Sequence, residues 1–144
     1  MAENGSYRCE YCGFALWRPI ASFGVSFLGL YDDSRFPGRC ILVVREHEER
    51  WEAMPSALLH DFVDDSQVAM KAISMATKCD RVNMAVLGNT DAHVHYHLIP
   101  RVPEVEPNPR KSPWSDPRPH GHLTESELGA MGHRIASALA QLLG

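Results

Sequence analysis

The sequence predicts an α+β domain with a mainly antiparallel sheet and two helices. Short apolar stretches rich in aromatic and β-branched residues come in close pairs, and two longer stretches have helical periodicity. The helical stretches stand apart from the strand pairs, which favours α+β packing over a parallel β-α-β sheet. A length of 144 residues suits one domain, so residues 1–144 are expected to fold as a unit.

The first two strands are expected over residues 22–31 ("SFGVSFLGLY") and 40–45 ("CILVVR"). Both stretches hold the aromatic and β-branched residues that suit a pleated, half-buried surface. The residues between them, 32–39, supply the Asp, Ser, Pro and Gly of a turn, so the two strands form a hairpin-like pair.

A helix over about 55–78 and strands over 81–88 and 93–101 are expected next. Pro55 suits the first position of a helix, and apolar residues follow it at approximately helical spacing. The residues "NTDA" make a tight loop between the two strands.

Residues 102–122 are expected to form a Pro-rich loop, and residues 123–144 the last helix. The loop holds six of the ten prolines, so no regular element runs through it, and its length indicates a functional role. Thr124 and Glu127 have the spacing of a capping box, and a stripe of apolar side chains continues to the C-terminus.

Composition and charge narrow the range of partners. The net charge of −4 argues against a general nucleic-acid binder, which would be basic, although a local pocket can still be positive. No segment approaches the roughly 18 apolar residues of a membrane helix, and the N-terminus lacks the pattern of a signal peptide. We therefore expect a cytoplasmic protein with neither a membrane nor a nucleic acid as its partner.

Three histidines, His93, His95 and His97, occupy every second position of the expected fourth strand. Side chains with this spacing share one face of a strand, here over about 13 Å. The apolar and aromatic residues between them take the other face, toward the core. Two functions remain open for the row: a metal site of the His-x-His type, or an imidazole nucleophile with neighbours that serve phosphate and proton transfer.

Cys9 and Cys12, spaced C-x-x-C, indicate metal ligands or a redox pair in a reducing compartment. Together with His47 and one histidine of the row they would complete a closed Cys₂His₂ site, which is structural because it leaves no position for water. Cys40 and Cys79 are expected to be buried or bystander thiols.

The remaining histidines are expected on the surface. They are His60 in the first helix and His120, His122 and His133 in the loop and last helix.

Four stretches together resemble the histidine triad superfamily of nucleotide hydrolases and transferases. "HVHYHLI" matches the superfamily pattern, and "RFPGRCILVVREH" and "VNMAVLGNTDAHVHYHLIPR" are similar to the strands around its nucleotide site. "CEYC" resembles the zinc-binding N-terminus of bacterial members and of galactose-1-phosphate uridylyltransferases. The resemblance covers roughly residues 7–101 and implies the HIT-like fold, with residues 1–21 as an N-terminal zinc-binding segment.

The resemblance implies different tasks for the three histidines. His95 would be the nucleophile that attacks an α-phosphorus and forms a nucleotidyl-histidine intermediate, and His97 would contact the phosphate. His93 would be a metal ligand. The implied structural zinc site has the ligands Cys9, Cys12, His47 and His93.

The resemblance also implies nucleotide-binding residues. Asn89 and Thr90 match a loop that binds the α-phosphate, and Asn83 lies near a position that contacts the reacting phosphate. Asp32 resembles the residue that binds the ribose hydroxyls, with Asp33 as its rival.

Two further positions are less defined. Trp114 resembles an aromatic residue that some members place near the substrate, but its spacing from the triad is longer here. For Arg101 the alternative of a solvated surface residue with no role in the site stays open.

These residues favour a nucleotide hydrolase or nucleotidyltransferase that acts on a nucleoside polyphosphate, dinucleoside polyphosphate or nucleoside phosphoramidate. Hydrolysis is favoured because His97 stands where the transferase branch typically has Gln. The resemblance implies a homodimer. Two alternatives are a non-catalytic nucleotide-binding regulatory module and a metal-dependent hydrolase with zinc on all three triad histidines. The base, the leaving group and the pathway are not specified by these residues.

Overall fold

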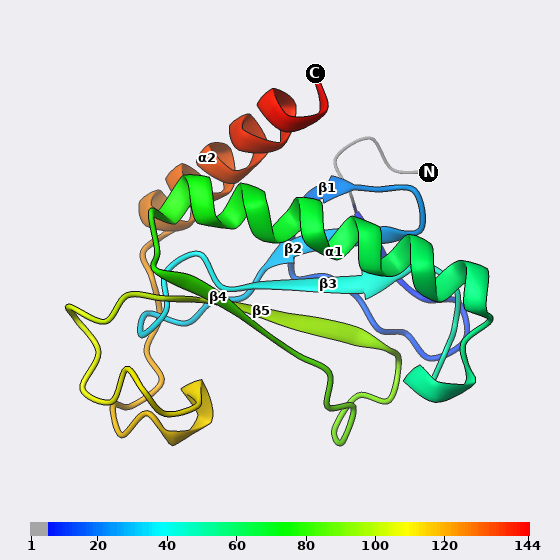
Figure 1. The fold of residues 1–144 in the computed structure, drawn as a ribbon, viewed down its shortest axis with the longest axis horizontal. Helices are drawn as coiled ribbons and strands as arrows, with labels where there is room; N and C mark the ends of the chain where they lie inside the picture. Colours follow the sequence, from blue (N-terminus) through cyan, green and yellow to red (C-terminus); the bar gives the residue numbers. More distant parts are fainter. Residues whose placement is uncertain (1–5) are drawn as a thin grey trace.

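The computed structural model describes residues 6–144 and consists of one sheet and two long helices (Figure 1). The elements are β1 (Arg18–Ser22), β2 (Ser26–Leu30), β3 (Cys40–Val44), η1 (Trp51–Ala53), α1 (Ser56–Thr77), β4 (Arg81–Ala85), β5 (His95–Arg101), η2 (Pro113–Ser115) and α2 (Glu125–Leu143). This architecture confirms the expected α+β class.

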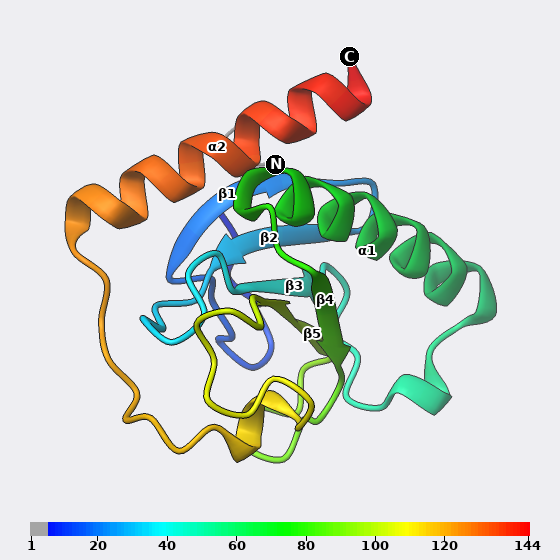
Figure 2. The ribbon, with the colours of Figure 1, turned by 60° about the vertical axis from the view of Figure 1, so that its left-hand side comes forward.

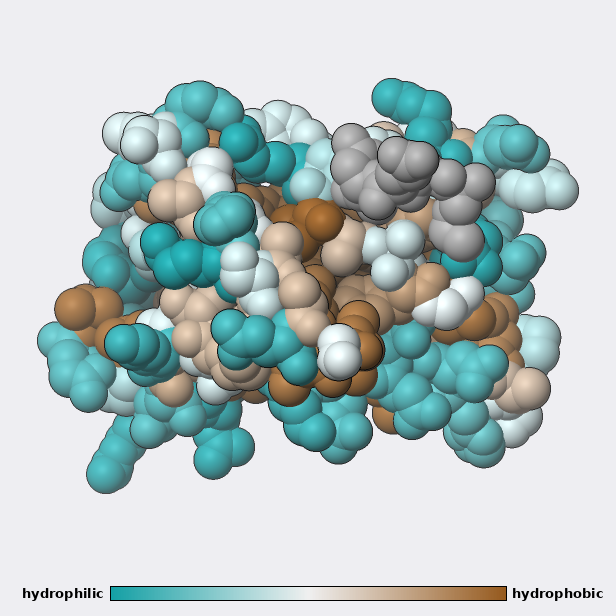
Figure 3. Space-filling view, turned by 90° about the horizontal axis from the view of Figure 1, so that it is seen from above, coloured by the Kyte–Doolittle hydropathy of each residue, from teal (hydrophilic) through white to brown (hydrophobic). Residues whose placement is uncertain are grey.

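The five strands form one antiparallel sheet in the order β1-β2-β3-β5-β4. Both helices cover the same face of this sheet, α1 over the β3, β4 and β5 side and α2 over β1 (Figure 2). Seen from the helix side, hydrophobic residues run across the middle of the molecule between mainly hydrophilic margins (Figure 3). The domain therefore has two layers, and the sheet face away from the helices is free to carry a site.

Side-chain alternation along β5 separates the core from the other face. Tyr96 and Leu98 are fully buried in the core under the helices, where the Tyr96 ring stacks on Phe62 with ring centroids 4.4 Å apart. His95 and His97 point to the opposite face of the sheet. The expectation that the residues between the histidines lie in the core is confirmed.

The first expected strand, residues 22–31, is wrong in its outline because the chain turns within it. Residues 18–22 form β1, which pairs with β2 through a turn closed by the hydrogen bond from Phe23 N to Ser26 O, 2.7 Å. Pro19 lies in β1, where an edge strand tolerates proline, next to an irregularity in the pairing.

The other elements follow the expectations closely. α1 ends where Lys78 takes a left-handed φ of 55°. At the start of α2 the expected capping box is present: Glu127 N donates to the Thr124 hydroxyl (3.1 Å) and Thr124 N donates to the Glu127 carboxylate (2.9 Å). His93 lies just before β5, which begins at His95, and Cys40 is buried as expected.

The Pro-rich loop is held against the domain by one buried and one partly buried ion pair. Arg101 is 6% exposed and donates from Nε to Glu106 (2.8 Å). The alternative that Arg101 is a solvated surface residue is therefore wrong. Arg118 pairs with Asp116 (2.8 Å) and also donates to the backbone oxygen of Arg35 (3.3 Å). These contacts give the loop a defined path beneath the β2–β3 turn.

Within residues 6–144, neither α1 nor α2 combines the length and apolar character that crossing a membrane requires.

Candidate functional site

A cavity of about 940 Å³ opens on the sheet face away from the helices. It lies between the N-terminal segment, the ends of β2 and β3, the loop before the triad and the Pro-rich loop. Its lining includes Phe14, Trp17, Leu30, Tyr31, Asp32, Arg39, Ile41, Asn89, Thr90, His95, His97, Trp114, His120 and His122.

The buried His95 has a defined proton position. Its Nδ1 lies 2.7 Å from the backbone oxygen of His93. Because a carbonyl oxygen can only accept, Nδ1 carries a proton, and in the neutral imidazole Nε2 therefore keeps its lone pair. The ring of Phe14 covers His95 at a centroid distance of 5.0 Å. In its neutral form His95 therefore presents the lone pair of Nε2 to this site.

His97 has the opposite arrangement. Its Nδ1 lies 3.2 Å from the NH2 group of Arg39, which can only donate, so Nδ1 accepts and the proton lies on Nε2. Burial, with the positive charge of Arg39 and the neighbouring His95, lowers the pKa of His97 to about 4. His97 is therefore a neutral imidazole that can donate one hydrogen bond from Nε2.

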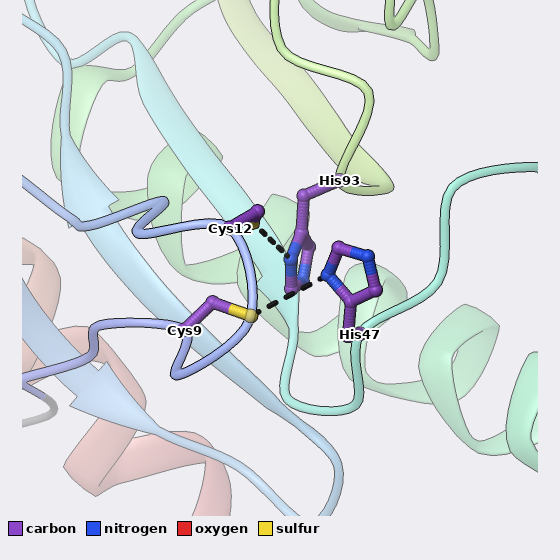
Figure 4. Close-up of side chains that lie close together, drawn as sticks. All are labelled: Cys9, Cys12, His47 and His93. Atoms are coloured by element: carbon purple, nitrogen blue, oxygen red, sulfur yellow. Dashed lines mark hydrogen bonds between the residues drawn. The ribbon is translucent and has the colours of Figure 1, made fainter.

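Cys9, Cys12, His47 and His93 form a compact group in which the four ligand atoms lie within 4.8 Å of one another (Figure 4). Cys9 Sγ is 3.5 Å from His47 Nδ1, and Cys12 Sγ is 3.4 Å from His93 Nδ1. Zn–S and Zn–N bonds of about 2.3 and 2.1 Å place neighbouring ligand atoms of a tetrahedral site about 3.6 Å apart. The donor set and its spacing therefore fit a tetrahedral zinc ion.

The outer partners of this group orient both imidazoles. His93 Nε2 lies 2.7 Å from the backbone oxygen of Val44, and His47 Nε2 lies 3.0 Å from the Glu49 carboxylate. Both Nδ1 atoms are thus left to face the sulfurs, as is usual for histidine ligands held by an oxygen acceptor.

The sulfur of Cys9 favours the metal-binding form. Burial alone would raise the pKa of Cys9, but hydrogen bonds from the backbone N–H groups of Cys12 and Tyr11 lower it to about 6. The thiolate is the form of cysteine that binds metals.

A protein-family model of the HIT domain matches residues 20–104, more than half of the chain. The chain belongs to the HIT domain family. The match includes the three histidines and the strands β2 to β5. No curated protein matches the chain in sequence.

Solved structures share the fold of this HIT protein. A histidine triad protein from Sinorhizobium meliloti has a TM-score of 0.75 and 23% identity, covering 84% of this chain and 88% of that one. A Zn-bound histidine triad family protein from Mycobacterium smegmatis has a TM-score of 0.60 and 17% identity, covering 86% and 84%. Diadenosine triphosphate hydrolase from Plasmodium falciparum has a TM-score of 0.59 and 13% identity, covering 99% and 90%.

The structure brings most of the expected site residues together. His95 and His97 line one cavity with Asp32, Asn89 and Thr90. The four expected metal ligands meet beside it.

Asn83 is placed differently from its expected position near the phosphate. It lies in β4 outside the cavity lining, and its side-chain oxygen accepts a hydrogen bond from Arg101 (2.7 Å). In this position the Asn83 side chain serves as a hydrogen-bond partner of Arg101.

The two candidate acidic residues of the turn have different environments. Asp33 is fully buried and ion-paired with Arg35 and Arg39, both at 2.9 Å. Asp32 reaches the cavity and accepts from the Leu123 backbone N–H (2.8 Å). Asp33 is therefore engaged by its arginine partners, while the Asp32 carboxylate faces the cavity, where it also contacts His122.

Four further residues line the cavity, and the family resemblance associates only Trp114 with the substrate. His120 and His122 are exposed, as expected, but they also line the cavity, where His122 lies 2.9 Å from the Asp32 carboxylate. Trp114 meets His97 edge to face at a centroid distance of 5.5 Å, because the Pro-rich loop returns to the sheet. Arg39 carried no motif signal, since its position depends on contacts distant in sequence.

The low pKa of His97 predicts a pH dependence of stability. As the pH falls below 6.5 the unfolded chain binds a proton at this residue, whereas the folded chain stays neutral until about pH 4. The contribution of His97 to stability is therefore present above pH 6.5 and is lost as the pH falls toward 4. Urea unfolding at pH 7 and pH 5 should give a smaller loss of unfolding free energy for His97→Gln than for the wild type. His60→Gln, which changes an exposed histidine of α1 outside the cavity, is the control for loss of a histidine. Equal losses in all three proteins would contradict the low pKa of His97.

Proposed function

We propose that this HIT protein is a nucleotide hydrolase or nucleotidyltransferase that acts at the α-phosphate through a nucleotidyl-histidine intermediate. The substrate would be a nucleoside polyphosphate, a dinucleoside polyphosphate or a nucleoside phosphoramidate. The proton position of His95 carries the proposal: with Nδ1–H donated to the His93 carbonyl, the lone pair of Nε2 is available to attack phosphorus. The fold shared with diadenosine triphosphate hydrolase supports the same chemistry.

The reaction has two balanced displacements. Nε2 of His95 forms a bond to the α-phosphorus while the bond to the leaving group breaks, and the electron pair departs with the leaving group. His95 keeps its Nδ1 proton, so the adduct is a nucleotidyl-imidazolium. Water then forms a P–O bond as the P–N bond breaks, the electron pair returns to Nε2, and the proton of water passes to solvent. Another acceptor in place of water would make the second step a transfer.

The rest of the cavity suits a nucleotide around this nucleophile. The Nε2–H of His97 can donate to a phosphate oxygen, and Thr90 and Asn89 offer a hydroxyl and an amide on the loop before the triad. Asp32 can accept from ribose hydroxyls. Leu30 and Ile41 give the same cavity an apolar wall that suits a nucleobase.

Replacement of the nucleophile is the direct test. His95→Ala should lower turnover of adenosine and guanosine polyphosphates and phosphoramidates by about 10⁴-fold or more, because the attacking atom is removed. Intact-protein mass measurement during turnover should detect a nucleotidyl adduct on the wild type and none on the variant. His60→Ala, which changes an exposed histidine of α1, should keep both turnover and adduct.

A non-catalytic binding module is the alternative that this experiment addresses. Nucleotide binding without turnover or adduct in the wild type would replace the hydrolase proposal with that module.

We also propose that the Cys₂His₂ group binds a structural zinc ion. The donor set, the spacing of its atoms and the Zn-bound M. smegmatis relative support this. Of the three triad histidines, only His93 belongs to the metal-binding group found among residues 6–144, which favours a structural ion over zinc on the whole triad.

Metal removal distinguishes a structural zinc ion in the Cys₂His₂ group from a catalytic zinc ion on the three triad histidines. The wild type should bind one zinc ion per chain, and Cys12→Ser should lose it together with several degrees of melting temperature, because the bound metal contributes folding free energy. Cys79→Ser, a cysteine outside the group, should keep both. Chelation at a temperature where the fold persists should leave most of the turnover, whereas immediate loss of turnover in a folded protein would support zinc on the triad.

We further propose that the protein forms a homodimer through β4. This strand lies at the edge of the sheet, and Met84, Val86 and Leu87 expose apolar side chains along and just beyond it. An exposed apolar edge is a ready template for pairing with a second copy about a twofold axis.

A charge placed on this edge tests the dimer. Light scattering coupled to size exclusion should give twice the chain mass for the wild type and the chain mass for Met84→Lys, because a lysine on an edge strand opposes pairing. Leu142→Lys, at the exposed end of α2, should remain dimeric. A monomeric wild type at micromolar concentration would contradict the proposal.

A further inference from the structure

Arg39 is a buried arginine, 5% exposed, that joins the β2–β3 turn to the triad. Its NH1 donates to Asp33 at 2.9 Å, and its NH2 lies 3.2 Å from His97 Nδ1. Its guanidinium carbon lies 3.9 Å from the centre of the Tyr31 ring and 5.7 Å from that of Trp114. The guanidinium is thus fixed on several sides.

The Nε of Arg39 is buried without a hydrogen-bond partner among residues 6–144. A buried donor without a partner is disfavoured, and such groups in native structures call for an explanation. The contacts to Asp33 and His97 therefore set the position of the side chain, and they leave the Nε–H without a partner.

The contact between Arg39 and His97 restricts the position of the proton on the His97 ring. A guanidinium has donors only, so it stabilises the form of His97 with its lone pair on Nδ1 and its proton on Nε2. The groups that face His97 are Arg39, His95, the Tyr31 ring and Trp114, and none of them is an anion. No neighbouring carboxylate favours an imidazolium, since the charge of Asp33 is engaged by Arg35 and Arg39.

We propose that Arg39 is a positioning residue that holds His97 as a neutral Nε2–H donor, so that His97 binds the substrate phosphate without giving up its proton. This rests on the proposed function. A neutral imidazole that released its remaining proton would become an imidazolate, which is too basic to form at neutral pH. His97 is therefore a hydrogen-bond donor in this site and does not act as the general acid.

The consequence is a preference among leaving groups. A phosphate group, whose second pKa is about 6, can depart as an anion with the electron pair of the broken P–O bond and needs no proton. An amine, whose conjugate acid has a pKa of about 10.4, must receive a proton at nitrogen before the P–N bond breaks. The other imidazoles of the cavity, His120 and His122, direct the single N–H of their neutral rings to Asp32: His120 Nε2 lies 2.7 Å from its backbone oxygen and His122 Nδ1 lies 2.9 Å from its carboxylate. The site therefore favours a phosphoric anhydride over a phosphoramidate.

The experiment compares wild type, Arg39→Gln and Arg35→Gln. Glutamine offers both a donor and an acceptor, so it releases the proton position of His97, while Arg35 still pairs with the buried Asp33. Arg35→Gln is the matched control because Arg35 contacts the same carboxylate without touching His97. The readouts are the imidazole ¹⁵N shifts of His97 from pH 5 to 9 and kcat/KM for adenosine triphosphate and an adenosine alkylphosphoramidate.

The wild type and Arg35→Gln should hold His97 as Nε2–H across this pH range, with kcat/KM at least about tenfold higher for the anhydride. Arg39→Gln should give a mixture of the two proton positions and lower turnover of the anhydride by about 10- to 100-fold, which is the usual effect of losing an outer partner of a functional histidine. The ratio of kcat/KM for the anhydride to that for the phosphoramidate should also become smaller.

Three results would overturn the proposal: His97 protonated on Nδ1 in the wild type at pH 7, equal effects of the Arg39 and Arg35 substitutions, or a wild-type preference for the phosphoramidate. If no nucleotide is turned over, the proposed function fails. If Arg39→Gln does not fold, a proton on Nδ1 of His97 in the wild type would still overturn the role of Arg39.

Discussion

The strict alternation of β5 is the constraint on which the core and the cavity both depend. Tyr96 and Leu98 are locked under the helices, and the ring of Phe62 stacks on Tyr96. A shift of one residue in the pairing would move both apolar side chains to the open face and bury the histidines in an apolar core. Packing under the helices therefore fixes the direction of His95 and His97, so the core determines the geometry of the site.

Neighbouring groups then give these two similar histidines opposite proton positions. A backbone carbonyl accepts from Nδ1 of His95, whereas a guanidinium donates to Nδ1 of His97. One imidazole is left with a lone pair on Nε2 and the other with a proton there. The ring centroids are only 5.0 Å apart, so in the proposed reaction the nucleophilic and the donating nitrogen would face the same phosphate. The difference arises from partners of the rings, since both residues share a strand and a face.

Local patterns in the sequence predicted the parts of the structure that depend on local physics. The alternation at residues 93–97, the helix periodicity and the capping box at Thr124 are each contained within a few residues, and all three are present. β1 was missed because Pro19 weakens the strand signal of an edge position that tolerates it. Arg39 meets His97 across 58 positions and His122 meets Asp32 across 90, so no local pattern could place them. The contact of Asn83 with Arg101 likewise joins residues on adjacent strands and has no local signal.

His93 links the metal-binding group to the proposed nucleophile. Its Nδ1 faces Cys12, its Nε2 is held by the backbone oxygen of Val44, and its own backbone oxygen accepts from His95. The N-terminal segment that carries the two cysteines also places Phe14 against the rings of both His93 and His95. A metal ion held by this group, as proposed, would therefore also fix the backbone that orients His95. A metal ion that takes no part in the chemistry would still hold the lone pair of His95 toward the phosphate, because a single residue serves both.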